Sequence, residues 1–243
     1  MKFYSLIISF LLSISATVWS ASETIVSRLF PIGQTEQKPL YTQTTQIEKN
    51  GPESFTSNAR IEDAKGQIMM TEVVVVKEGT LVSQKVTQLQ TSQAWDLAVQ
   101  AKKATYQSFK LKGDGSRDKT SENSVEMAED FINGPMIELF IVKHWQTLIE
   151  GKTVKAHLSV LELEKPVSFE FKKEADSSRG GQKVLVVQMR PANFLIAMLV
   201  DPIRLEFSYE GKRLVYFKGR TPLKIQEGGK NIPLDAEILY SVQ

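Results

Sequence analysis

GPMIELFIVKHWQTLIEGKTVKAHLSVLELEK, residues 134–165, is the stretch of sequence that decides the fold. Pro135 suits the first turn of a helix, where the φ of proline is already set and its missing N–H would have no partner. Gly151 suits the left-handed position that ends a helix. From Val154 onwards apolar and polar residues alternate, which is the period of a β-strand. We therefore expect one helix over about 135–150 and a strand directly after it.

The expected helix is apolar over more than half of its circumference. Apolar residues recur at helical spacing along one stripe, and others lie on the remaining faces. The stripe consists of Ile137, Ile141, Trp145 and Leu148, and the other faces carry Met136, Leu139 and Val142. A helix of this kind is buried on most sides or lines an apolar cavity.

Most of the remaining chain reads as β-strands separated by turns. Apolar runs bounded by Gly, Pro, Asn and Asp predict strands over 40–48, 54–61, 67–77 and 81–89. The segment 92–109 fits a helix or two short strands, and the strands on both sides of it favour two strands. Residues 112–121 are polar and aperiodic and predict a loop. Residues 124–132 fit a short helix or a strand.

The C-terminal part holds a central strand and a second apolar helical segment. Residues 183–189 (KVLVVQM) are apolar on both faces, which favours a strand in the middle of a sheet. Residues 194–200 (FLIAMLV) predict a short helix, and Asp201-Pro202 ends it. Turn signals then predict hairpins over 204–217 and 223–240.

These elements predict a mainly β fold. We expect a strongly curved antiparallel sheet, or an unclosed β-barrel, that encloses the main helix (about 135–150) and the short helix (about 192–200). A chain of 243 residues commonly forms one large β domain. The expected division is a signal peptide over 1–20, an extended N-terminal lead-in over 21–39, and a single β-rich domain over 40–243.

The N-terminus has the pattern of a secretory signal peptide. Lys2 gives a short positive region, residues 6–14 are apolar, and Val18 and Ser20 are small enough for the −3 and −1 positions. We expect cleavage after Ser20 and a periplasmic or secreted protein. The alternative is that the segment is kept as a membrane anchor, although serines and a threonine dilute its apolar run.

Composition and motifs exclude several classes of function. The chain has no cysteine, so disulfides, thiolate metal sites and N-terminal lipidation on cysteine are ruled out. Its formal net charge of +2 gives no long-range attraction for nucleic acid. The two histidines, His144 and His157, have no carboxylate at ligand spacing, so we expect no metal site and no cofactor. No Gly-x-Ser-x-Gly elbow or other nucleophile motif occurs, and we expect a protein that is not an enzyme.

Two groups of residues are candidates for a binding site. The first is an apolar pocket between the sheet and the helices, and its candidate walls are Met136, Phe140, Trp145, Phe194 and Met198. The same residues fit a packed core with no ligand. The second group is a basic cluster that fits either lipid headgroups or a sheet edge protected by charge: Lys212, Arg213, Lys218 and Arg220.

Several of these motifs together resemble an uncharacterised family of secreted proteobacterial β proteins, a domain of unknown function. The likeness covers roughly residues 40–240 and rests on Gly134-Pro135, Trp145, Leu148-Ile149-x-Gly151, Val187-x-Met-x-Pro191, Leu199-Val-Asp-Pro-Ile203 and Gly219-Arg-Thr221. The family is similar in outline to the periplasmic lipoprotein carriers, whose open β-barrels hold helices against an apolar cavity. This resemblance implies a lipid or another apolar ligand.

The leading hypothesis is a non-enzymatic periplasmic protein that binds or carries an apolar, lipid-like ligand, with peripheral membrane contact as an option. The alternative is a cell-envelope scaffold or interaction protein, which would have a fully packed core and a protein partner. A hydrolase with a site assembled from distant residues ranks last, because no local motif supports it.

Overall fold

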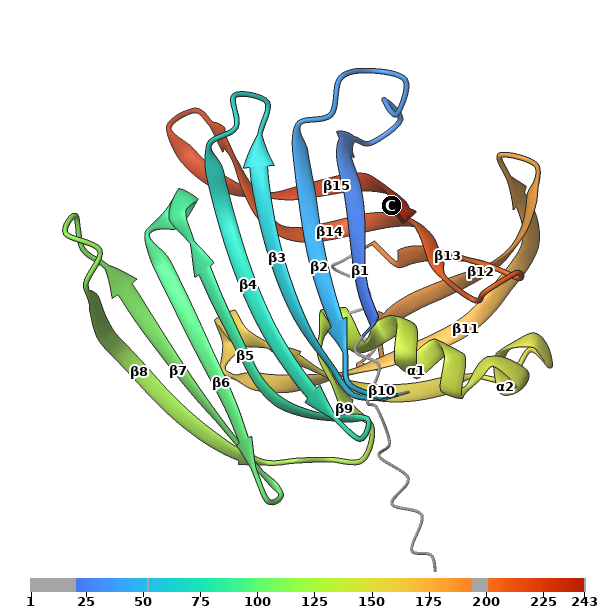
Figure 1. The fold of residues 1–243 in the computed structure, drawn as a ribbon, viewed down its shortest axis with the longest axis horizontal. Helices are drawn as coiled ribbons and strands as arrows, with labels where there is room; N and C mark the ends of the chain where they lie inside the picture. Colours follow the sequence, from blue (N-terminus) through green and yellow to red (C-terminus); the bar gives the residue numbers. More distant parts are fainter. Residues whose placement is uncertain (1–20, 52, 194–200, 243) are drawn as a thin grey trace, which may run out of the picture.

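The computed structural model describes residues 21–51, 53–193 and 201–242. In this part of the chain fifteen strands form one strongly curved sheet (Figure 1). The mainly β fold with an unclosed, curved sheet is therefore confirmed. In chain order the strands are β1 (Ala21–Pro31), β2 (Tyr41–Lys49), β3 (Phe55–Asp63), β4 (Ile68–Lys77), β5 (Thr80–Gln88), β6 (Gln93–Gln100), β7 (Lys103–Leu111), β8 (Arg117–Glu126), β9 (Phe131–Ile132), β10 (Val154–Val160), β11 (Lys165–Arg179), β12 (Gln182–Pro191), β13 (Ile203–Ser208), β14 (Leu214–Glu227) and β15 (Lys230–Val242).

Apart from β8 and β9, strands that are consecutive in the chain are neighbours in the sheet, and one long-range pairing joins β1 to β15. The sheet runs from β8 down to β1, continues with β15, and runs down again to β9. Neighbours pair antiparallel, except that the two-residue strand β9 lies parallel to β10. The edge strands β8 and β9 are consecutive in the chain but are not hydrogen-bonded to each other. The sheet therefore has an open seam, which we define as the gap between β7–β8 and the 3₁₀ turn η3 (Leu161–Leu163).

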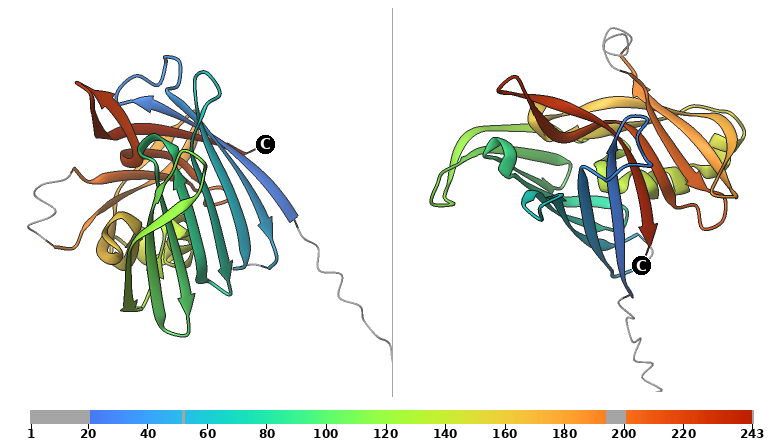
Figure 2. Two further views of the ribbon diagram at one scale, coloured as in Figure 1. Left: turned by 90° about the vertical axis from the view of Figure 1, so that its left-hand side faces the viewer. Right: turned by 90° about the horizontal axis from the view of Figure 1, so that it is seen from above.

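The helical segment lies within the curve of the sheet (Figures 1 and 2). It begins with the 3₁₀ turn η2 (Gly134–Met136), where the side chain of Asn133 accepts a hydrogen bond from Met136 N at 3.2 Å. It continues as α1 (Ile137–Lys143) and α2 (Trp145–Ile149), which meet at His144. The sequence predicted one continuous helix, whereas the structure has two short helices separated at His144. Gly151 has φ +77°, as expected for the residue that ends the helix.

Two buried apolar clusters fill the inside of the sheet. The first surrounds α1 and α2 and joins residues of β4–β7 to residues of β10–β13, so the helices fill the space between the two walls. The second contains Leu29, Met70, Trp95 and Leu223 and packs β14–β15 against β1 and β3–β6. The two clusters hold together the open sheet, which has no hydrogen-bonded closure.

Several sequence-based assignments are confirmed. The segment 92–109 forms the two strands β6 and β7, apart from the turns around them. In β12 the four residues Val184–Val187 are all buried, as expected for a central strand. The expected helix over about 192–200, with Phe194 and Met198, lies outside the described residues from 194 onwards.

Three other assignments need correction. Ala21–Pro31 was expected to be a lead-in outside the domain, yet as β1 it pairs with both β2 and β15. The segment Arg117–Glu126 forms the edge strand β8, although half of it was predicted to be a loop. Both faces of this strand are exposed, so its sequence does not alternate between apolar and polar residues. The basic strand β14 is not a sheet edge, because it lies between β13 and β15. Within the described residues, no helix has the length and apolar character needed to cross a bilayer.

Candidate functional site

An open cleft of about 450 Å³ lies at the seam. Three apolar side chains meet polar groups in its lining, which includes Trp95, Ser108, Phe109, Ser121, Leu163 and Glu164. Leu163 is 55% exposed. The pocket candidates that the structure describes, Met136, Phe140 and Trp145, do not line this cleft.

The turn after η3 crosses the seam through Glu164. Its carboxylate accepts hydrogen bonds from Ser108 Oγ at 2.5 Å and from Ser121 Oγ, and its carbonyl accepts one from Asn123 Nδ2 at 2.8 Å. Glu164 has a φ of +51°, a left-handed conformation that is uncommon for a residue with a side chain. Side-chain contacts therefore link β7 and β8 to the opposite wall where backbone pairing is missing.

The pocket candidates that the structure describes are brought together, but inside the first apolar cluster. Met136, Phe140 and Trp145 are 2%, 3% and 7% exposed. The ring of Phe140 lies 5.2 Å from that of Phe171, and Trp145 meets Tyr209 edge-on at 5.6 Å. These contacts are those of a packed core.

His144 joins the two helices beside this cluster. Its ring lies 4.5 Å from that of Phe140, and its Nε2 lies 4.0 Å from a carboxylate oxygen of Asp130. Burial lowers the pKa of His144, and the charge of Asp130 opposes this effect. Within the described residues, no group of histidine and carboxylate side chains has the arrangement of a metal site.

The four basic residues do not form one free cationic patch. Arg220 pairs with Asp235 at 2.5 Å, and Lys218 Nζ lies 3.7 Å from Glu237. The Nζ atom of Lys212 lies 5.4 Å from the centre of the Trp145 ring.

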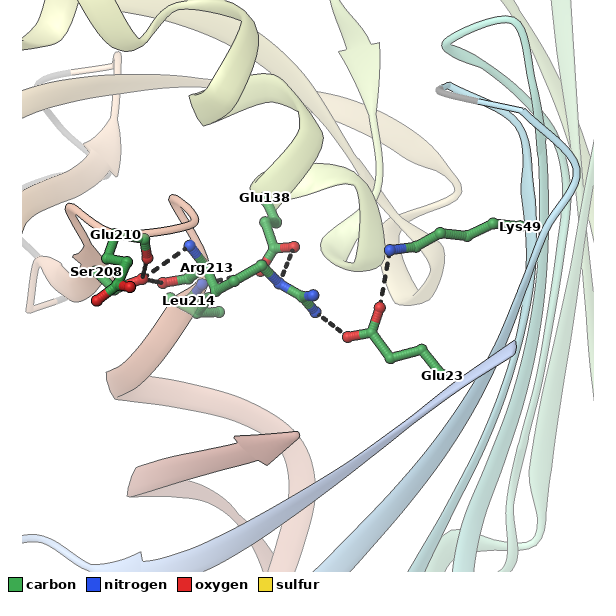
Figure 3. Close-up of polar contacts among 7 residues, drawn as sticks. All are labelled: Glu23, Lys49, Glu138, Ser208, Glu210, Arg213 and Leu214. Carbon is green, nitrogen blue, oxygen red and sulfur yellow. Dashed lines mark hydrogen bonds and ion pairs between the residues drawn. The ribbon is translucent and has the colours of Figure 1, made fainter. Parts of the chain in front are cut away.

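Arg213 is part of an ionic cluster between the sheet and the helix (Figure 3). Its Nε lies 2.8 Å from Glu138 Oε1 of α1, and its Nη2 lies 2.5 Å from Glu23 Oε1 of β1. Lys49 of β2 contacts the other oxygen of Glu23 at 2.8 Å, and Glu138 also accepts from Leu214 N at 2.8 Å. Burial opposes ionisation of Glu23, but the contacts with Arg213 and Lys49 outweigh it and lower the pKa of its carboxyl. Arg213 is thus engaged within the fold.

A polar pair on the inner face of the sheet was missed by the sequence reasoning. Gln84 Nε2 of β5 donates to Glu72 Oε1 of β4 at 2.6 Å. Burial raises the pKa of the Glu72 carboxyl, and the hydrogen bond from Gln84 opposes this effect. A signal was present in the sequence, since Glu72 interrupts the apolar face that contains Met70 and Val74.

No protein-family model matches this chain, and no curated protein matches it. Among solved structures, the chain is similar to a β-barrel-like protein of the domain of unknown function DUF1849 from Brucella abortus. The two are 11% identical, the match covers 91% of this chain and 94% of that chain, and the TM-score is 0.42. It is also similar to a DUF1329 family protein from Desulfovibrio piger, with 9% identity, 93% and 85% coverage and a TM-score of 0.31. The expected resemblance to uncharacterised, β-barrel-like domains of unknown function agrees with both.

Proposed function

We propose that this protein is a non-enzymatic binding protein of the periplasm or cell surface, which takes up a small molecule with an apolar part. The observation that carries the proposal is the cleft of about 450 Å³ at the seam, where Trp95, Phe109 and Leu163 meet hydroxyl and carboxylate groups. The volume lies in the usual range of small-molecule sites. Polar residues form most of the lining, and the three apolar side chains offer a contact for the apolar part of a ligand.

The open sheet supports entry of a ligand at this point. Closing a barrel by a complete ladder of backbone hydrogen bonds leaves no edge through which a molecule can pass. Here β8 and β9 do not pair, and the described links across the seam include the side-chain contacts of Glu164. The two walls can therefore separate locally without breaking a strand ladder.

A pair of matched leucine variants tests the proposal. Leu163 lines the cleft and is 55% exposed, whereas Leu89 is 48% exposed and lies outside it. An uncharged apolar fluorophore, N-phenyl-1-naphthylamine, should gain fluorescence on binding to the protein. We expect Leu163→Asp to weaken its binding and Leu89→Asp to leave it unchanged. Absence of binding to the wild-type protein, or equal effects of both variants, would contradict the proposal.

The second candidate function is a scaffold or interaction protein of the cell envelope. The packed contacts of Met136, Phe140 and Trp145 favour it, because they show helices that act as core. It predicts binding to a protein partner without any small molecule. Recovery of a stoichiometric protein complex from lipid-free protein would support it.

A further inference from the structure

Gln84 donates to Glu72 and presents its own amide oxygen to the inside of the sheet, with no hydrogen-bond donor to it among the described residues. Gln84 Nε2 is used in the 2.6 Å bond to Glu72 Oε1, and the remaining Oε1 of Gln84 has no hydrogen-bond partner among the described residues. Gln84 is only 6% exposed, so water does not freely reach this oxygen. An acceptor that is buried and unpaired has a considerable free-energy cost, which a ligand that donates a hydrogen bond would remove.

Glu72 lies among buried apolar residues on the inner face of the sheet but keeps some accessible surface. On the inner face its neighbours Ala59, Met70, Val74 and Val86 are all buried, with exposures of 7%, 5%, 0% and 6%. Glu72 itself is partly accessible. The carboxyl thus keeps free surface in the middle of an apolar wall, between the two buried clusters.

The charge at this place is not balanced within the described part of the chain. No lysine, arginine or histidine of the described residues forms an ion pair with Glu72, and its carboxyl accepts a hydrogen bond from the neutral side chain of Gln84. Other polar residues on the same face of the neighbouring strands, Thr45 and Ser57, are neutral. A carboxylate and an amide oxygen side by side form a favourable site for an ammonium group, which offers several donors and a compensating charge.

We propose that Glu72 and Gln84 bind the protonated amine of an amphipathic ligand, whose apolar chain lies between the buried clusters. This inference rests on the proposed function and specifies the class of ligand. Trp95 at the cleft pairs across the sheet with Val86, which pairs with Glu72. Two strand spacings, roughly 10 Å, separate the cleft from the carboxyl. A linear chain of about twelve carbons is long enough to cover this distance.

Three probes with the same chain test the proposal: dodecylammonium, dodecanol and dodecanoate. Binding to the purified protein is measured by isothermal titration calorimetry at neutral pH, below the concentrations at which the probes form micelles. We expect the amine to bind most tightly. A hydrogen bond to a charged group contributes about 1.5–3 kcal/mol, so Glu72→Gln should weaken binding of the amine roughly tenfold to hundredfold and change that of dodecanol little.

Two further variants separate this role from a general effect on the fold. Glu48→Gln removes an exposed glutamate on the outer face of β2, and should leave the preference for the amine intact. Gln84→Leu removes the second acceptor and should weaken binding of the amine while a circular dichroism spectrum stays unchanged. Equal binding of all three probes to the wild type, or a preference that survives Glu72→Gln, would overturn this inference alone. Absence of binding by every probe would overturn the proposed function as well.

Discussion

Arg213 Nη2 lies 2.5 Å from Glu23 Oε1, and this ion pair ties β1 to the turn between β13 and β14. Because the same guanidinium contacts Glu138 of α1, one side chain joins two parts of the sheet to the helix. Arg213 is 27% exposed and Glu23 14%, so the pair is well shielded from water. We infer that it holds the helix in position inside the sheet.

The Arg213→Ala variant is expected to unfold more readily. It leaves Glu23 and Glu138 without their shared cation, and we expect a loss of about 2–3 kcal/mol in the free energy of unfolding, measured by urea denaturation. Arg220→Ala is the matched control, because Arg220 pairs with Asp235 in an exposed position, at 52% and 47% exposure. Its loss should stay below about 1 kcal/mol. Similar losses in both variants would show that the cluster has no special role.

Glu72→Gln should change the pH dependence of stability. The pKa of Glu72 is raised by burial above the ordinary value of 4.5, so the folded state holds its proton more tightly than the unfolded state. As pH rises through 4.5, the unfolded chain ionises first and the wild type loses stability until the folded carboxyl also ionises. Glutamine does not titrate, so the variant escapes this loss.

The variant should therefore gain stability relative to the wild type between about pH 4 and about pH 8. Denaturation curves of both proteins at the two pH values measure this difference. A difference that is the same at both values would contradict the raised pKa.

Phe140→Ala tests whether α1 is core. Phe140 is 3% exposed and packs on Phe171, so its truncation should cost about 3–5 kcal/mol of unfolding free energy through the cavity it leaves. Val142→Ala on the same helix is the control, because Val142 is 38% exposed and its loss should cost about 0.5 kcal/mol or less. If Phe140→Ala keeps the stability of the wild type, Phe140 faces an empty space instead of packed neighbours.

Glu164→Ala should loosen the seam. Removing the carboxylate leaves the hydroxyls of Ser108 and Ser121 without this acceptor, a loss of about 1 kcal/mol per hydrogen bond. Hydrogen exchange followed by mass spectrometry should show faster exchange in β8 than in the wild type. Glu162→Ala, a change two residues away at a side chain that pairs with Lys224, should leave exchange in β8 as it is. Unchanged exchange in Glu164→Ala would show that other contacts hold the seam.

Local patterns were sufficient to predict many elements but not how they come together. Alternation from Val154 gave β10, and the apolar run over 183–189 gave β12, because one or both faces of these strands are buried. The edge strand β8 carries no such pattern, since water surrounds both of its faces. The pairing of β1 with β15 depends on contacts between the two ends of the chain, which no local period records.

The candidate site was less accessible to sequence reasoning for the same reason. Met136, Phe140 and Trp145 were proposed as pocket walls because they belong to one strongly apolar helix, but an apolar pattern does not distinguish a core from a pocket wall. The cleft at the seam combines β6, β7, β8 and η3, which meet only in the folded sheet. Glu72 could be seen in the sequence as a break in an apolar face. Its role as a candidate binding group depends on its hydrogen bond with Gln84 of the next strand, which the sequence pattern does not show.

The most direct test of the central claim is native mass spectrometry of the purified protein, followed by extraction of its small molecules. We predict a bound molecule with an apolar chain at close to one per protein, released on unfolding. A protein that is free of any small molecule, folds cooperatively and takes up none of the added amphiphiles would contradict the claim and favour the scaffold function.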